Sequence, residues 1–142
     1  MLHAMTKKYI LVLASEPTEV GKVEPFLEDL NKNLRLGEPQ FNKLLVAATE
    51  AVNNGIIHGN RRDPRKKVTL TCEVNHETLI VRVDDEGQGV DTGHLPNPLT
   101  EENLLRENGR GVFLMRSLMD DVEFGRATAG SFVIMKMTLG RN

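Results

Sequence analysis

Apolar residues along the chain follow two patterns, and one of them, short runs rich in apolar and β-branched residues, predicts strands. Such runs occur at residues 8–14, 68–74, 79–83, 122–126 and 132–139. The segment Asn75-His-Glu-Thr78 between the second and third runs is typical of a hairpin connection, and Thr128-Ala-Gly130 predicts a turn between the last two. The pattern therefore indicates five short strands, most of them joined as hairpins.

The other pattern, an apolar residue at every third or fourth position, predicts helices in three places. One helix covers about residues 18–33. A second begins at Pro39, because proline is favoured at the first helical position, and reaches about Ile57. A third covers residues 112–119.

The segment 84–110 is rich in Gly, Pro and Asn and predicts a long loop, with room for a short helix near residues 101–105. A loop of this length in a compact domain is most often functional, for example as a lid. The order of elements predicts an α/β (α+β) two-layer sandwich, in which helices cover one face of a mixed, mostly antiparallel sheet. We expect a single domain over residues 1–142.

Composition narrows the class of protein. The 142 residues are 39% hydrophobic and 27% charged, which is typical of a soluble globular chain. The net charge of −2 offers no general basic field for direct nucleic-acid binding. The single cysteine, Cys72, fits a reducing compartment, and no apolar run approaches the roughly 18–20 residues that span a membrane. Residues 9–14 follow two lysines but lack a cleavage site, so we read them as a strand and expect a cytoplasmic protein.

The second predicted helix carries an unusual polar face. At about 100° per residue, one broad apolar stripe forms from Phe41, Leu45, Ala48, Val52, Gly55 and Ile56. Glu50 and Asn54 lie nearly opposite this stripe, one helical turn apart. A solvated face explains such a pair, yet Val46, Ala47 and Ile57 share it, which favours a surface covered by a ligand or a lid. Glu50 could then accept a proton from an attacking hydroxyl, and the Asn54 carboxamide oxygen could bind Mg²⁺.

Three acids follow the third predicted strand, in the sequence Asp84-Asp85-Glu86-Gly87. They form an ordinary charged turn, or they supply a buried carboxylate that accepts the exocyclic amine of adenine. Guanine would present a carbonyl oxygen to that carboxylate, which would repel it. Gly87 and Gly89 would let the backbone approach the base closely.

A second glycine pair, Gly109-Arg110-Gly111, precedes the third helix. It is either a simple turn or an anion site, in which helix N-terminal amides and the Arg110 charge meet phosphates. The chain has no Gly-Lys-Ser/Thr of a Walker loop and no full Gly-x-Gly-x-x-Gly after its first strand. Each feature is weak alone, but their order and spacing together predict a pocket for ATP and Mg²⁺.

These segments resemble the N, G1 and G2 boxes of the Bergerat-fold ATPases, which include gyrase, heat-shock chaperones and histidine kinases. Within that superfamily, Thr49-Glu-Ala-Val-Asn-Asn-Gly-Ile-Ile-His-Gly59, Asp85-Glu-Gly-Gln-Gly89 and the segment 109–122 are similar to the anti-sigma factor serine kinases. The resemblance covers roughly residues 8–139.

The resemblance implies a protein-serine kinase that phosphorylates an anti-anti-sigma protein, binds and inhibits a sigma factor, and is often a homodimer. It implies Glu50 as the general base and Asn54 as the Mg²⁺ ligand. The other implied ATP contacts are Asp85, Gly87 and Gly89 at adenine, Gly109, Arg110, Gly111 and Val112 at the phosphates, and, more weakly, His58 and Ser131.

Alternatives remain open at this point. The chain could hold ATP and grip a sigma factor without transferring phosphate, or act as a switch kinase in a signalling complex that never contacts sigma. The basic segment 61–67 could be a solvated connection or a docking site for an acidic partner.

Overall fold

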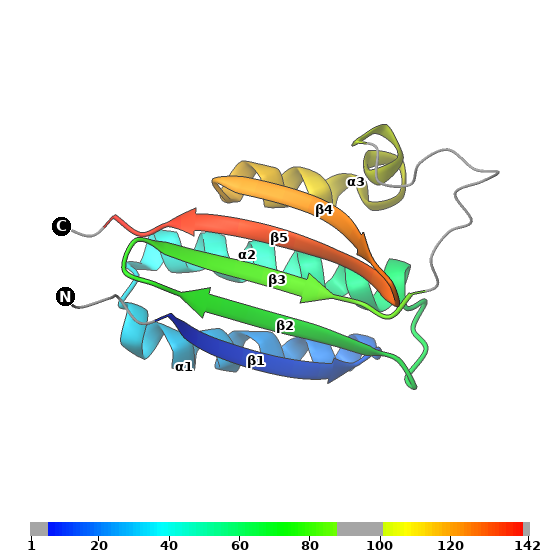
Figure 1. The fold of residues 1–142 in the computed structure, drawn as a ribbon, viewed down its shortest axis with the longest axis horizontal. Coiled ribbons are helices and arrows are strands. Elements are labelled where there is room, and N and C mark those ends of the chain that lie inside the picture. Colours follow the sequence, from blue (N-terminus) through cyan, green and yellow to red (C-terminus); the bar gives the residue numbers. More distant parts are fainter. Residues whose placement is uncertain (1–5, 88–100, 141–142) are drawn as a thin grey trace.

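The computed structural model describes residues 6–87 and 101–140, with residues 101–108 as backbone only. Figure 1 shows a single sheet with the helices on one of its faces. The sheet has five strands in the order β1-β2-β3-β5-β4. The strands are β1 (Lys7–Ala14), β2 (Lys67–Val74), β3 (Thr78–Asp84), β4 (Asp121–Ala127) and β5 (Gly130–Thr138). Every pairing between the described strands is antiparallel, so the expected two-layer sandwich with a mostly antiparallel sheet is confirmed, and no parallel pair occurs among these strands.

The helical layer contains η1 (Pro17–Lys22), α1 (Val23–Leu34), α2 (Glu38–Asn54), η2 (Gly55–Gly59) and α3 (Glu101–Leu118). The helix predicted over residues 18–33 is thus divided into a 3₁₀ segment and α1. The second predicted helix ends as a π-helical turn, η2. Within the described residues, no helix combines the length and the apolar character needed to cross a membrane.

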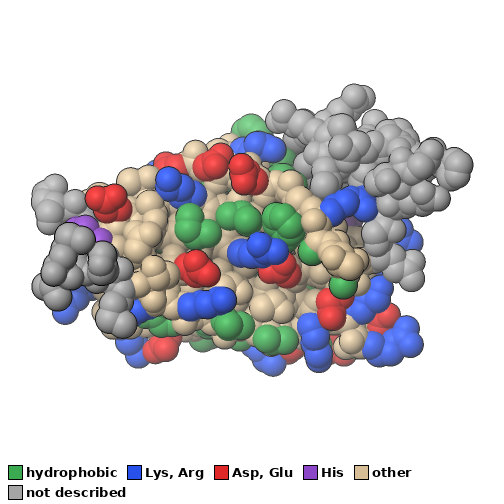
Figure 2. Space-filling view, viewed as in Figure 1, with side chains coloured by type: hydrophobic (Ala, Val, Ile, Leu, Met, Phe, Trp, Pro, Cys, Tyr) green, Lys and Arg blue, Asp and Glu red, His purple; other side chains and the backbone are tan. Residues whose placement is uncertain are grey.

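The core lies between the helices and the inner face of the sheet. Strand alternation supplies it: Leu70 on β2 stands opposite Val83 on β3, and Val81 stands opposite Met135 on β5. All four of these side chains are buried. The opposite face of the sheet is mixed, and Figure 2 shows hydrophobic side chains among charged ones on it. Ile10 on β1 is one of the exposed hydrophobic residues of the described chain.

The apolar stripe predicted for α2 is partly wrong. The buried residues of this helix are Leu44, Ala47, Ala48, Ala51 and Val52, whereas Phe41 and Leu45 are only half-buried. The reason is that α2 packs on α1 and the sheet on one side and on α3 on the other. Small residues such as Ala47, expected on the ligand face, allow this double contact.

The third helix begins earlier than the sequence predicted. It runs through residues 101–105, where a short helix was expected, and continues to Leu118 with a break at Gly109, whose φ is 13° and ψ is −85°. The expectation of a lid was made for residues 84–110, and the central part of that segment, residues 88–100, lies outside the described residues.

Replacing Leu44 by alanine tests this packing. The side chain is fully buried, so its truncation should lower the free energy of unfolding by about 2–5 kcal/mol. Val46 on the same helix is 38% exposed, and Val46→Ala should cost less than about 1 kcal/mol. Urea unfolding of both variants measures the difference, and equal losses would contradict the assignment of the buried face of α2.

Candidate functional site

Asp85 is the best-fixed acidic residue at the end of the sheet. It directly follows β3, and its backbone N–H donates to the carbonyl oxygen of Ser131 at 2.9 Å. Its carboxylate Oδ1 accepts the backbone N–H groups of Gly87 at 2.9 Å and of Ser131 at 3.2 Å. Ser131, which the resemblance implied as an ATP contact, thus holds the Asp85 backbone and carboxylate through its own backbone groups.

Burial raises the pKa of Asp85 above its usual value, because the ionised carboxylate is partly removed from water. The hydrogen bonds from Gly87 and Ser131 and the charge of Lys66 act in the opposite direction, and the neighbouring Asp84 adds repulsion. An ionised Asp85 is thus held at an energetic cost, which is typical of a functional rather than a stabilising acid.

Three glycines allow other backbone segments to reach Asp85. A Cβ atom on Gly59, the last residue of η2, would lie 2.3 Å from Asp85 Oδ2. A Cβ on Gly87 would lie 2.2 Å from the carbonyl oxygen of Gly59, and one on Gly130 would lie 1.9 Å from the carbonyl oxygen of Asp85. No side chain fits at these positions, so the end of η2, the segment after β3 and the turn before β5 meet around one carboxylate.

The sequence assigned no role to Gly59 or Gly130, although Gly59, directly after His58, ends the first motif of the resemblance and Gly130 stands in a predicted turn. Neither position indicates which backbone segment packs against the glycine.

Asn60 is a second residue that sequence reasoning missed. It is only 1% exposed, and its carboxamide nitrogen donates to Ser15 Oγ at 2.7 Å and to the Lys67 carbonyl oxygen at 2.9 Å. Its carboxamide oxygen accepts the backbone N–H of Glu86 at 2.8 Å. One buried side chain therefore ties the end of β1, the start of β2 and the segment after Asp85 together.

Glu50 and Asn54 do converge, as their spacing predicted. Both are half-buried on α2 and face Gly111 of α3. A Cβ on Gly111 would lie 3.2 Å from Glu50 Oε2 and 3.1 Å from Asn54 Nδ2. The two side chains thus share one small region in the contact between α2 and α3.

The Asn54 carboxamide nitrogen is buried and has no hydrogen-bond partner in the described part of the chain. An unsatisfied buried amide costs about 1–3 kcal/mol, so a bound ligand or water molecule that pairs with this group would be favoured here. A half-turn of the carboxamide would present its oxygen, a donor atom that suits Mg²⁺. No three His, Cys, Asp or Glu side chains gather as metal ligands among the described residues, so a Mg²⁺ ion here would need phosphate oxygens as further ligands.

The second glycine pair lies beside these two residues. Gly109 has non-helical dihedral angles, Arg110 is exposed, and Gly111 and Val112 are buried. A break of this kind interrupts the hydrogen-bond ladder of a helix, so that backbone N–H groups of the next turn become available to an anion.

The remaining predicted residues are less well connected. His58 lies in η2 and is exposed, and among the described residues it forms no hydrogen bond or ion pair with Asp85 or Glu50. Gly89 lies outside the described residues.

The fold has a counterpart among known families. Residues 13–137 match the model of the histidine kinase-like ATPase domain, and the chain belongs to this family. A solved histidine kinase domain, from the blue-light activated histidine kinase EL346 of Erythrobacter litoralis, has a TM-score of 0.53 and 17% sequence identity. The match covers 84% of this chain and 60% of the histidine kinase domain, and the likeness concerns the fold alone.

Within the family, the chain is similar to anti-sigma factors, which confirms the resemblance seen in the sequence. The anti-sigma F factor of Oceanobacillus iheyensis is 27% identical over 145 residues, covering 100% of this chain and 97% of the relative. The serine-protein kinase RsbW of Listeria innocua is 25% identical over 141 residues, covering 95% of this chain and 90% of the relative.

Replacing Gly59 by alanine tests the close approach at Asp85. The added methyl group would collide with the carboxylate and should lower the free energy of unfolding by about 1–3 kcal/mol. Gly21→Ala is the matched control, because a Cβ there meets nothing within 4 Å. Thermal and urea unfolding compare the two, and a Gly59→Ala variant as stable as Gly21→Ala would show that η2 does not touch Asp85 in solution.

Proposed function

We propose that this protein is an ATP-dependent serine kinase, which phosphorylates an anti-anti-sigma protein and also binds and inhibits a sigma factor. One observation carries the proposal, the arrangement of polar groups along α2 and η2. Glu50 and Asn54, whose amide is unsatisfied among the described residues, meet beside Gly111. Asp85 is held half-buried near the end of η2. The family membership supports the use of ATP, and the similarity to an anti-sigma F factor and to a serine-protein kinase supports the anti-sigma and kinase roles.

At one end of the site, Asp85 would recognise adenine. Two backbone N–H groups hold Oδ1, and Oδ2 lies against Gly59, where only a glycine fits. A carboxylate fixed in this way can accept the exocyclic amine of adenine and repel the carbonyl oxygen of guanine. Gly87 would let the backbone approach the base.

At the other end, Asn54 would hold Mg²⁺ together with phosphate oxygens, and the N–H groups around Gly111 would bind the phosphates. Mg²⁺ supplies neutralisation of the phosphate charge, which dominates catalysis of phosphoryl transfer together with positioning. Arg110 is exposed beside this point and would add positive charge.

Glu50 would act as the general base, four residues before Asn54 on α2. Its carboxylate would take the proton of the acceptor serine as the serine oxygen attacks the γ-phosphorus. The bond to the bridging oxygen breaks, and ADP leaves with that oxygen.

The family also suggests how the protein works with others. The anti-anti-sigma protein, the sigma factor, a homodimeric state and a cytoplasmic location are all proposals for this chain. The alternative is an ATP-binding anti-sigma or signalling module that lacks either kinase activity or sigma binding. Incubation with γ-labelled ATP and candidate anti-anti-sigma proteins, followed by pull-down of sigma factors, separates these functions.

Replacing Glu50 by alanine should retain ATP binding within about threefold and lower phosphotransfer by about 10²–10⁴-fold, since a general base contributes that much. Glu38→Ala, which removes an exposed acid from the first turn of the same helix, should leave both unchanged. Single-turnover transfer and nucleotide titration measure the two effects. Normal transfer by Glu50→Ala would remove this residue from the role of base.

Replacing Asp85 by asparagine should weaken ATP binding by about 10–100-fold, because a hydrogen bond to a charged group is lost. Asp84→Asn is the neighbouring control, since Asp84 pairs with Arg82 at 2.9 Å instead of approaching Gly87. If the Asp85→Asn variant and the wild type bind ATP with equal affinity, adenine is bound elsewhere in the protein.

The raised pKa of Asp85 gives this variant a pH signature. The folded state binds a proton at Asp85 more tightly than the unfolded state, so the wild type loses stability as the pH rises through the folded-state pKa. At neutral pH, Asp85→Asn should therefore be at least as stable as the wild type, and this advantage should shrink on acidification. Thermal unfolding across the acidic range checks the sign.

A further inference from the structure

The segment that joins η2 to β2 concentrates positive charge. We define residues 61–67 as the basic loop: five of its seven residues are Arg or Lys, and one is Asp. The chain as a whole has 18 basic and 20 acidic residues, so this loop departs from the balance of the molecule. Figure 2 shows basic side chains gathered at the right-hand end of the visible face, where β2 begins in Figure 1.

The backbone of the basic loop is fixed in a costly conformation. Arg61 and Arg62 both have left-handed dihedral angles, with φ of 52° and 59°. For residues with a side chain these dihedral angles are unfavourable, and such strain is retained where the surroundings enforce it.

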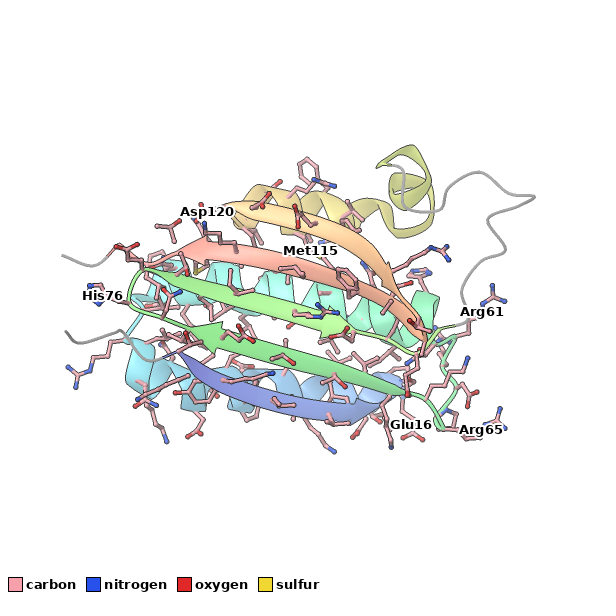
Figure 3. The ribbon with its side chains drawn as sticks, viewed as in Figure 1. Glu16, Arg61, Arg65, His76, Met115 and Asp120 are labelled. Carbon is pink, nitrogen blue, oxygen red and sulfur yellow. The ribbon has the colours of Figure 1, made fainter. Side chains whose placement is uncertain are left out.

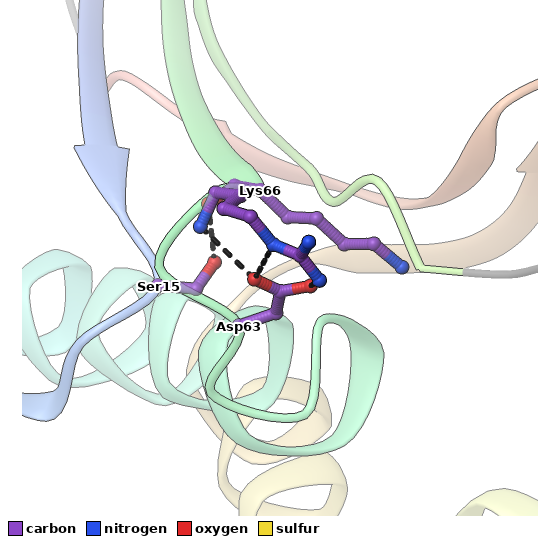
Figure 4. A network of polar contacts seen from close by, with 4 residues as sticks. Ser15, Asp63 and Lys66 are labelled. Atoms are coloured by element: carbon purple, nitrogen blue, oxygen red, sulfur yellow. Dashed lines mark hydrogen bonds and ion pairs between the residues drawn. The ribbon is translucent and has the colours of Figure 1, made fainter.

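The surrounding hydrogen bonds do enforce it. The N–H of Arg62 donates to the Ile56 carbonyl oxygen at 2.8 Å, and the N–H of Lys66 donates to the Asp63 carbonyl oxygen at 3.0 Å. Ser15 Oγ donates to the Lys66 carbonyl oxygen at 2.8 Å, as Figure 4 shows. The loop therefore presents its charges on a preorganised frame, which lowers the entropic cost of binding a partner.

Only part of this charge is neutralised within the loop. Asp63 accepts hydrogen bonds from Arg65 through both carboxylate oxygens, each at 3.0 Å, and these bonds lower the pKa of Asp63 to about 2. Arg61 and Arg62 are exposed, and neither forms an ion pair within the described part of the chain. In Figure 3, Arg61 and Arg65 point outward at the end of the molecule where η2 lies.

The basic loop also borders the candidate site. It follows Asn60, which holds Glu86, and the backbone N–H of Lys67 donates to the Glu86 carboxylate. Gly59, two residues before Arg61, lies against Asp85. A protein that covers the mouth of the site from this end would therefore meet the basic loop.

We propose that the basic loop docks an acidic surface of the protein that carries the acceptor serine; this inference rests on the proposed kinase function. The acceptor must place its hydroxyl at Glu50, which lies nine residues before Gly59 on a nearly continuous helix, or about 14 Å away along its axis. A small domain of about 30 Å diameter spans that distance. Nucleic acid is a poorer fit, because the net charge is −2 and no aromatic residue lies in the loop for stacking.

The test compares steady-state phosphotransfer by the wild type, R61N/R62N, R61K/R62K and R35N, with the anti-anti-sigma protein that the wild type phosphorylates. Asparagine tolerates left-handed dihedral angles, so R61N/R62N removes two charges at little backbone cost. R35N is the matched control: Arg35 is exposed, has φ of 57°, and lies at the opposite end of α2. Thermal unfolding within about 2 °C of the wild type establishes that each variant is folded.

For R61N/R62N, we expect the KM for the acceptor to rise about tenfold, with kcat and the KM for ATP unchanged, because peripheral charges mainly affect encounter with the partner. The effect should be larger at low salt. R61K/R62K and R35N should remain within twofold of the wild type. Calorimetry in the presence of ADP measures the affinity for the acceptor without catalysis. This affinity should be weakened in R61N/R62N and close to that of the wild type in R61K/R62K and R35N.

Three results would overturn the proposal. The first is an acceptor KM and affinity for R61N/R62N that match those of R35N while the wild type transfers phosphate normally. The second is weakened binding of a sigma factor alone, which would assign the loop to that partner. The third, a wild type that phosphorylates no anti-anti-sigma protein, would refute the proposed kinase function, and the docking role would fall with it.

Discussion

The close backbone approach around Asp85 is the constraint on which the rest of the site depends. Gly59, Gly87 and Gly130 come from three separate segments, and none of them can carry a Cβ without moving the acid or its neighbours. This contact fixes how the end of η2 lies against the sheet, and with it the direction of the whole α2–η2 segment. The position of Glu50 relative to Asp85 follows from that geometry, because a helix transmits position rigidly.

The same helix serves the core and the site, which limits how either can change. Its small buried residues, Ala47, Ala48 and Ala51, let α2 pack between other elements, and its polar side presents Glu50 and Asn54 to α3. An amide left without a partner at Asn54 and a carboxylate held above its usual pKa at Asp85 both lower stability. Groups kept at such a cost are typical of functional sites, because binding rather than folding satisfies them.

Much of the fold could be predicted because its elements are locally encoded. The strand runs and the starting region of α2 agree with the structure closely, since alternation, proline position and hairpin segments act within a few residues. The direction of every strand could not be predicted, and a mixed, mostly antiparallel sheet was expected, because strand direction depends on which strands become neighbours. The apolar stripe on α2 was partly wrong, because a single-faced helix was assumed and the structure buries Ala47 as well as Ala48.

Within the site, local spacing was enough to predict the pair that one helix carries: Glu50 and Asn54 are one helical turn apart, and their convergence follows from helical geometry. The contacts between elements came from the folded chain alone: Gly59 lies against Asp85, Ser131 donates to its carboxylate, and Asn60 accepts the N–H of Glu86. These contacts join residues up to 46 positions apart, and no local spacing encodes them. They arise from the packing of the helices on the sheet, which depends on burial of the whole core at once.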